Sequence, residues 1–146
     1  MSSTKIVSFR DLDAWQAAMD LAVIAHEVAA QLPPEQRFEL GSQIRRAATS
    51  VPSNVAEGHA HRSDRSYLRH VRIALGSLFE LDTQLELACR QGLIETQDLQ
   101  SPRAAIARTG QVLHGLQRAL RRRFYGSVAT ATSLVMGIMV GAVMLL

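Results

Sequence analysis

Apolar side chains recur every three or four residues along most of this chain, the spacing that gathers them on one face of an α-helix. Ser8 to Asp11 resembles a capping box at the start of the first such run. The periodicity predicts four helices, at about residues 9–31, 35–58, 63–92 and 97–123.

Proline and glycine residues mark where these helices should stop. Pro33 and Pro34 separate the first helix from the second, and Gly58 and Gly92 fit the ends of the second and third. Pro52 lies inside the second run and should kink or interrupt it, because proline has no backbone N–H to donate. Four helices with short connections predict an all-α, up-down four-helix bundle.

The C-terminal segment differs from the rest of the chain. Residues 124–146 carry no charged side chain, and 16 of these 23 residues are apolar. As a helix they would span roughly 34 Å, against about 30 Å of bilayer hydrocarbon. We therefore expect a four-helix bundle over residues 1–123 and a C-terminal transmembrane helix over residues 124–146. The alternative is a buried core helix of a soluble oligomer.

Basic and aromatic residues stand at the start of that segment. Arg121, Arg122 and Arg123 precede it, and Phe124 and Tyr125 lie at the boundary. Basic residues stay on the cytoplasmic side of a membrane, and aromatic residues favour its interface. This order predicts a tail anchor in the inner (cytoplasmic) membrane, with lipid as a partner and the bundle in the cytoplasm.

Small residues within the segment recur at helical spacing and share one face. They are Gly126, Thr130, Ser133, Gly137 and Gly141. Small residues let transmembrane helices approach closely, so this stripe predicts that the tails associate with one another. The alternative is a chance occurrence of the GxxxG pattern in a glycine-rich span.

Basic residues cluster on the third predicted helix. The chain has 16 basic and 13 acidic side chains, a formal net charge of +3. Arg62, Arg65, Arg69 and Arg72 form one stripe, and Arg45 and Arg46 would join it if the second and third helices are neighbours. Arginine binds phosphate bidentately, so the stripe is a candidate nucleic-acid surface. The alternatives are a solvated face and salt bridges to the acidic first helix of the same or a neighbouring subunit.

Signals of catalysis are weak. No phosphate-binding loop, nucleophile elbow or CxxC motif occurs, and His59 and His61 are too sparse for a metal site. Cys89, the single cysteine, falls on the core pattern of its helix and reads as a packing thiol. We expect no enzymatic activity, no cofactor and no metal.

Residues 43–58 and 74–85, together with 12–16, resemble the four-helix-bundle proteins encoded in 23S ribosomal RNA intervening sequences. The accessory variability proteins of diversity-generating retroelements are similar. The resemblance covers about residues 8–120. It implies a ring, often a pentamer, with a basic surface that binds nucleic acid or a reverse transcriptase, and no enzymatic activity. Members of the family usually end near the position of Arg123, so the uncharged tail is a departure.

The family motif matches a set of polar and small residues of the second and third predicted helices. They are Arg45, Arg46, Ser50, Pro52, Asn54, Glu57, Gly58, Gly76, Ser77, Glu80 and Thr83. We interpret most of them as fold and assembly residues. Gly76 and Ser77 would allow close helix contact, and Asn54 and Glu57 would bond backbone or arginine near the Pro52 bend.

Two functions follow as hypotheses. The first is a ring-forming, non-enzymatic membrane protein whose head clusters several transmembrane tails, either as an anchor or as a pore-forming effector such as one in phage defence. The second is a membrane-tethered adaptor that binds nucleic acid or a reverse transcriptase through its arginine surface.

Overall fold

The computed structural model describes the backbone of residues 6–61 and 63–144, and the side chains of these residues up to Gly126. Described helices alternate with short turns, and no described residue lies in a β-strand. The elements in chain order are η1 (Phe9–Asp11), α1 (Asp13–Gln31), α2 (Pro34–Arg37), α3 (Leu40–Ala60), α4 (Asp64–Arg90), η2 (Thr96–Leu99) and α5 (Gln100–Met144).

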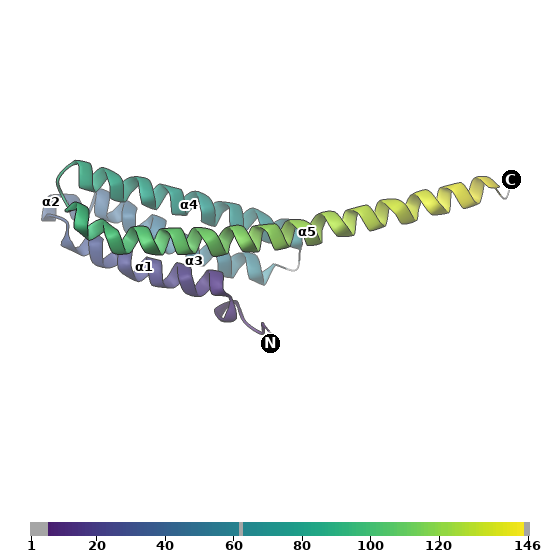
Figure 1. Ribbon diagram of the computed structural model, residues 1–146, viewed down its shortest axis with the longest axis horizontal. Coiled ribbons are helices and arrows are strands. Elements are labelled where there is room, and N and C mark those ends of the chain that lie inside the picture. The colour runs from purple at the N-terminus through teal and green to yellow at the C-terminus, as the bar shows by residue number, and fades with distance from the viewer. Residues whose placement is uncertain (1–5, 62, 145–146) are drawn as a thin grey trace.

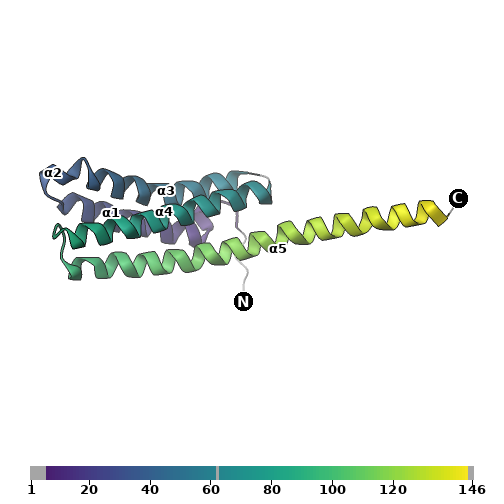
Figure 2. The same cartoon turned by 90° about the horizontal axis from the view of Figure 1, so that it is seen from above.

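Four of these helices form an up-down bundle. α1 and α4 each pack against both α3 and α5, so the four helices close a square in the order α1, α3, α4, α5. Figures 1 and 2 show the four long helices running side by side, with α2 at one end of the bundle and the extension of α5 leaving from the other. The predicted all-α four-helix bundle is confirmed.

The capping box at the start of the chain closes a separate turn. The Asp11 carboxylate accepts backbone N–H groups from Val7 and Ser8 at 2.9 and 2.8 Å, and these bonds lower the pKa of that carboxyl. Leu12 is then extended, with φ −79° and ψ 124°, and α1 begins at Asp13. The predicted helix over 9–31 is therefore a 3₁₀ turn followed by an α-helix.

The predicted second helix differs from the structure at three points. It is divided into α2 and α3 at Phe38 and Glu39, and its end lies at Ala60 rather than at Gly58. Of the two effects expected at Pro52, a kink or an interruption, the interruption was wrong, because α3 runs through Pro52. Side chains on both sides of the proline bond carbonyls one turn back: Ser53 Oγ donates to Thr49 O at 2.9 Å.

Both predicted boundaries of α4 are confirmed. Ser63 caps the helix, and its Oγ accepts the Ser66 backbone N–H at 3.4 Å. Gly92 follows the last turn with φ +71°, a left-handed conformation that glycine adopts without the steric cost of a Cβ atom. The chain can then reverse through η2 into α5.

Leucine, alanine and valine side chains from all four long helices fill the core. Among the largest fully buried side chains are Leu21, Ile44, Val51, Leu78, Leu81, Leu113 and Leu120. Each buried leucine contributes about 1.5–3 kcal/mol relative to its exposed state. The described core extends from Leu12 to Leu120, so it closes just before the uncharged segment begins.

α5 is a single 45-residue helix that continues beyond the bundle. No proline or other break separates its bundled part from residues 124–144. Among the residues that the structure describes, no helix is both long and apolar enough to cross a membrane. The side chains of Thr130, Ser133, Gly137 and Gly141, predicted to pack tails together, lie outside the described residues.

Candidate functional site

A seam of polar side chains joins α3 to α4, and the family motif supplies most of it. Ser50 Oγ and Ser77 Oγ share a hydrogen bond of 2.8 Å. Asn54 Nδ2 donates to Ser50 O at 2.9 Å, and Asn54 Oδ1 lies 3.2 Å from Nδ1 of His70. Glu57 lies 3.6 Å from the same His70 nitrogen. The expected partners of Asn54 and Glu57 were backbone or arginine. Asn54 does bond a backbone carbonyl, that of Ser50, and the structure adds His70 as a partner of both side chains.

Gly58 is a point of close approach between α3 and α4. A Cβ atom built on Gly58 would lie 2.5 Å from Cδ2 of Tyr67, which leaves no room for a side chain. Tyr67 is buried against this glycine, and burial raises the pKa of its phenol to about 12. Its hydroxyl has no hydrogen-bond partner among the described residues.

Three other motif residues lie on the exposed face of α4. Gly76, Glu80 and Thr83 all face away from the core. A Cβ atom on Gly76 would meet nothing within 4 Å, so the expectation that Gly76 allows close helix contact does not hold within one bundle. Thr83 Oγ1 and Glu80 bond only residues of their own helix, Phe79 and Gln84. Among the described residues, these three motif positions therefore make no bond or close contact with another helix of the bundle.

Exposed apolar side chains accompany these three residues. Phe79 is 58% exposed, and Ile73 and Leu87 are 39% and 45% exposed. Ile73, Gly76, Glu80, Thr83 and Leu87 are spaced three or four residues apart, so they follow one line along α4. We call this line, together with Phe79, the α4 face.

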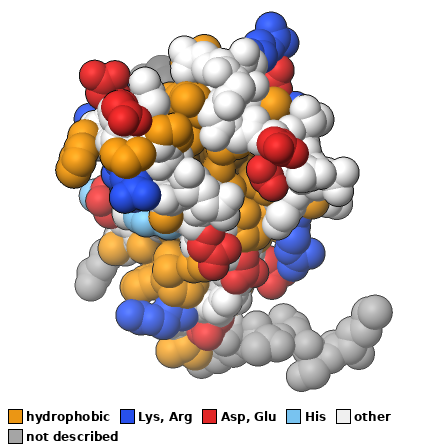
Figure 3. All heavy atoms as spheres, turned by 90° about the vertical axis from the view of Figure 1, so that its left-hand side faces the viewer, with side chains coloured by type: hydrophobic (Ala, Val, Ile, Leu, Met, Phe, Trp, Pro, Cys, Tyr) orange, Lys and Arg blue, Asp and Glu red, His pale blue; other side chains and the backbone are white. Residues whose placement is uncertain are grey.

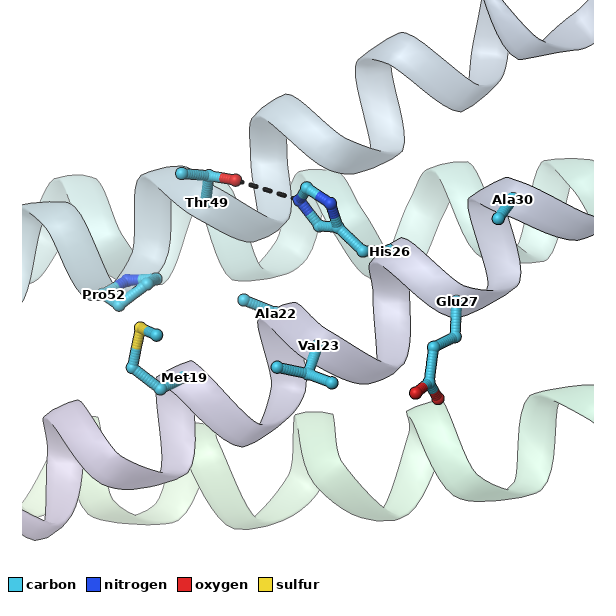
Figure 4. Close-up of a pocket in the computed structure, with 8 residues that line it drawn as sticks. All are labelled: Met19, Ala22, Val23, His26, Glu27, Ala30, Thr49 and Pro52. Atoms are coloured by element: carbon cyan, nitrogen blue, oxygen red, sulfur yellow. Dashed lines mark hydrogen bonds between the residues drawn. The ribbon is translucent and has the colours of Figure 1, made fainter.

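A second apolar surface lies between α1 and α3. It is a groove of about 500 Å³ that is lined mainly by apolar side chains, among them Met19, Val23 and Pro52. Figure 4 shows Met19 extending from α1 toward Pro52 of α3, with Ala22 between the two helices. At the other end of the groove, Nε2 of His26 lies 3.1 Å from Oγ1 of Thr49 (Figure 4). We call this surface the α1–α3 groove.

A third hollow lies between the arginine stripe of α4 and the part of α5 that leaves the bundle. It has a volume of about 520 Å³. Arg65, Arg69 and Arg72 line it with Ser63 and Ser66 from α4. Phe124 and Tyr125 of α5 line it as well, and Leu68 completes it. We call it the basic groove.

The arginines of the basic groove have no carboxylate partner among the described residues. The acidic residue next to them, Asp64, is already paired with Arg123, whose Nη2 lies 3.0 Å from Oδ1 of Asp64. No ion pair joins the stripe to the acidic α1 of the same chain, so that alternative is excluded for the described arginines. Arg62 lies outside the described residues.

Arg45 and Arg46 do not belong to this cluster, although α3 and α4 are neighbours. The two helices are antiparallel, and the Ser50–Ser77 bond sets their register. Arg46 therefore lies level with about residue 81, roughly 13 Å along the axis from Arg72. Arg45 Nη2 donates to Arg37 O at 2.6 Å, and Arg46 donates to Gln43. Arg45 therefore joins α3 to the end of α2, whereas Arg46 bonds only within α3.

The two ends of the bundle differ in charge. The end away from the tail carries exposed Glu35, Glu39, Glu95 and Asp98. Figure 3 views this end and shows both acidic and basic side chains distributed among hydrophobic ones. The opposite end carries the basic groove and the exposed Arg121 and Arg122 of α5. Positive charge is therefore concentrated where α5 leaves the bundle.

The juxtaposition of Phe124 and Tyr125 with the arginine stripe was not foreseen from the sequence. About sixty residues separate the two segments, and no local pattern links them. The only signal was the predicted up-down order of the helices, which places the start of the third helix beside the end of the fourth. Within the described part of the chain, no group of three or more potential metal ligands lies together.

Four antiparallel helices, a polar seam between α3 and α4, and surface grooves define the described part of the chain as a four-helix-bundle protein. The chain belongs to the 23S rRNA-intervening sequence protein family, whose model matches residues 10–115. The match ends before the uncharged segment. The family resemblance expected from the motifs is confirmed.

The fold is similar to that of a solved protein of unknown function from the S23 ribosomal protein family of Bacteroides thetaiotaomicron. The TM-score is 0.66 and the identity 22%, over 72% of this chain and 95% of that one. At this identity the similarity supports the fold alone. No curated protein matches the chain.

Proposed function

We propose that this chain is a non-enzymatic membrane protein. Its bundles join into a closed ring, a pentamer by family resemblance, and the ring gathers the C-terminal helices into one transmembrane cluster at the cytoplasmic membrane. The observation that carries the proposal is the continuity of α5, which passes from the bundle core into the uncharged segment without a break.

α5 needs an apolar environment for its second half. Inside the bundle it contributes Leu113 and Leu120 to the core. Beyond residue 126 the helix stands clear of the other described helices in both views (Figures 1 and 2). Its sequence there is uncharged and mostly apolar. A helix of that composition in water would expose a large apolar surface, which lipid or neighbouring tails would cover.

Two apolar surfaces on different elements support assembly into a ring. The α1–α3 groove is a concave surface, and the α4 face presents Phe79 as a projecting side chain. A contact between unlike surfaces of two copies is heterologous, and a closed ring satisfies every such surface. Such a contact would also explain a glycine at position 76 of the α4 face, because glycine would let a helix of the neighbouring copy approach the α4 backbone.

The tail and the ring need separate tests. For the tail, we compare the full chain with residues 1–123, which retain the whole described core up to Leu120. The full chain should sediment with membranes and resist extraction by salt or carbonate, whereas residues 1–123 should stay in the supernatant. Equal distribution of both chains would overturn the membrane assignment.

For the ring, the mass of residues 1–123 in solution is measured by light scattering. Phe79→Glu should reduce the assembly to a monomer, because it places a charge in the contact. Phe38→Glu is the matched control, since Phe38 is 87% exposed but lies in the turn between α2 and α3. A wild-type monomer, or equal effects of the two substitutions, would contradict assembly through the α4 face.

Measurement of the membrane potential in cells that express the protein distinguishes an anchor from a pore. A pore formed by the tails predicts membrane depolarisation on expression of the full chain, but not of residues 1–123. Normal membrane potential with correctly inserted protein would leave the anchor as the function and remove the effector role.

The unpaired arginines of the basic groove favour a second candidate, a membrane-tethered adaptor for nucleic acid or a reverse transcriptase. Binding through these groups would be largely independent of sequence and would fall steeply with salt. Replacing Arg62, Arg65, Arg69 and Arg72 by Ala should abolish RNA or DNA binding by residues 1–123. Unchanged affinity would remove this role.

A further inference from the structure

We propose that the basic groove binds the phosphate of an anionic glycerophospholipid, and so holds lipid of the inner leaflet against the base of the tail. The inference rests on the proposed membrane insertion of residues 124–146. It assigns the arginine stripe of α4 to lipid, whereas the sequence alone indicated a nucleic-acid surface, a solvated face or salt bridges.

The groups in the groove match a lipid headgroup. Arg65 and Arg69 are exposed and have no carboxylate partner among the described residues, so their guanidinium forks are available to an anion. Guanidinium groups bind phosphate oxygens bidentately. Ser63 and Ser66 bring hydroxyl groups to the same hollow, and hydroxyls can bond the phosphate or the polar headgroup.

The groove also lies at the right depth. Arg123 Nη2 lies 3.0 Å from Asp64 Oδ1, so the start of α4 is level with the start of the uncharged segment. At about 1.5 Å per residue, Arg65 and Arg69 stand within roughly 8 Å of that level along the helix axis. The polar layer on each side of a bilayer is on the order of 5–8 Å thick. The guanidinium groups therefore fall in the layer that holds the phosphates.

The aromatic residues Phe124 and Tyr125 favour lipid over RNA as the ligand of the basic groove. Phe124 and Tyr125 line the groove on the side where α5 leaves the bundle, and Tyr125 is 56% exposed. Their rings stack edge to face on each other, with centroids 5.3 Å apart. Aromatic side chains in this position belong to the membrane interface, where a phenol stays hydrated above the acyl chains. A nucleic acid would have to enter between this surface and the bilayer.

The test uses the full chain in vesicles and two charge-matched variants. R65A/R69A removes two arginines of the groove. R46A/R108A removes two exposed arginines elsewhere on the bundle, so the net charge of the variants is equal. Each protein is purified in mild detergent and offered phosphatidylglycerol and phosphatidylcholine in equal amounts, and retained lipid is counted by native mass spectrometry.

Wild type and R46A/R108A should retain phosphatidylglycerol in preference to phosphatidylcholine. R65A/R69A should lose that preference by on the order of 30-fold, since each basic residue near an anionic surface contributes about 1 kcal/mol. Equal retention of both lipids by wild type, or equal loss by both variants, would overturn the site. Displacement of the lipid by soluble glycerol phosphate at the same concentration would show a free phosphate ligand instead.

Two further measurements, of vesicle flotation and of RNA binding, distinguish failure of the lipid site from failure of the membrane anchor. Flotation of the full chain with vesicles of phosphatidylcholine alone reports tail insertion, which does not need the groove. If the chain floats but shows no lipid preference, the groove fails while the anchor stands, and if it does not float, the anchor fails. Tight, salt-sensitive RNA binding lost in R65A/R69A, without lipid preference, would reassign the groove to nucleic acid.

Discussion

Gly58 of α3 lies directly against the ring of Tyr67 in α4, so that an added Cβ atom would stand 2.5 Å from Tyr67 Cδ2. The first prediction concerns this contact. Gly58→Ala should destabilise the bundle by about 1–3 kcal/mol, because a tightly packed helix pair must separate to admit the methyl group. Urea unfolding followed by circular dichroism measures the change.

Gly76 belongs to the same family motif as Gly58, but it is exposed on α4 and not packed against another helix. It lies inside α4 with nothing within 4 Å of a built Cβ atom, so Gly76→Ala should stabilise the isolated bundle by about 0.5–1 kcal/mol through helix propensity. Equal destabilisation by both substitutions would contradict the assignment of Gly58 to the fold and Gly76 to the surface.

The buried hydroxyl of Tyr67 gives the second prediction. Its pKa is raised to about 12 by burial, and it has no partner among the described residues. Tyr67→Phe should leave stability at pH 7 unchanged or increase it by on the order of 1 kcal/mol, since an unpaired polar group is removed from the interior.

The same residue predicts a difference at high pH. The unfolded phenol ionises near pH 10 and the folded one near pH 12, so the wild-type bundle should lose stability as pH rises through this window. Tyr67→Phe should lose less over the same range. Parallel pH profiles of the two proteins would show that the folded phenol titrates as it does in the unfolded chain.

Glu86 gives the third prediction, at the other end of the bundle. Its Oε1 accepts from Arg90 at 2.8 Å and its Oε2 from Arg103 of α5 at 2.7 Å, and these bonds lower the pKa of the carboxyl. The stabilisation is present above the ordinary pKa of glutamate and is lost as pH falls through the lowered value. Thermal melts between pH 6 and pH 3 should therefore show a smaller acid destabilisation in Glu86→Gln.

Arg103→Met tests which partner matters for that effect. It removes the bond between helices and leaves the bond to Arg90 within α4. The acid destabilisation should be smaller than in the wild type. An unchanged profile would assign the effect to Arg90 alone.

Thr109 gives the fourth prediction. Its side chain is fully buried, and its hydroxyl donates to Ala17 O at 3.1 Å, linking α5 to α1. Thr109→Val keeps the shape and removes the bond, so it should cost about 0.5–1.5 kcal/mol in urea unfolding. Thr83→Val is the matched control, because Thr83 is exposed and bonds only its own helix, and it should change stability by less than about 0.5 kcal/mol.

Local chemistry accounts for the parts of the fold that were predictable. The apolar period located the four long helices, Ser63 and Gly92 marked the boundaries of α4, and both act through bonds or torsions within a few residues. Pro52 was the local signal that misled. α3 nevertheless continues through Pro52, which is buried together with Val51 and Val55, and periodicity does not reveal that packing.

The candidate site was less predictable, because its members meet only through helix pairing. The arginine spacing placed Arg65, Arg69 and Arg72 on one face, and the structure bears this out. The spacing alone could not predict that Arg45 and Arg46 lie away from the stripe, because their distance from it depends on the antiparallel register of α3 and α4. Nor could the spacing predict that Phe124 and Arg65 line the same groove.

The sequence by itself therefore determined the positions of the long helices, the family and the uncharged segment, because each can be recognised from residue spacing or composition along the chain. Only the tertiary structure decided which side each residue faces. It buried Gly58, exposed Gly76 on the α4 face and closed the basic groove where α5 leaves the bundle. The physical reason is that side-chain neighbours across a bundle are set by helix order and register, and those follow from packing the whole core at once.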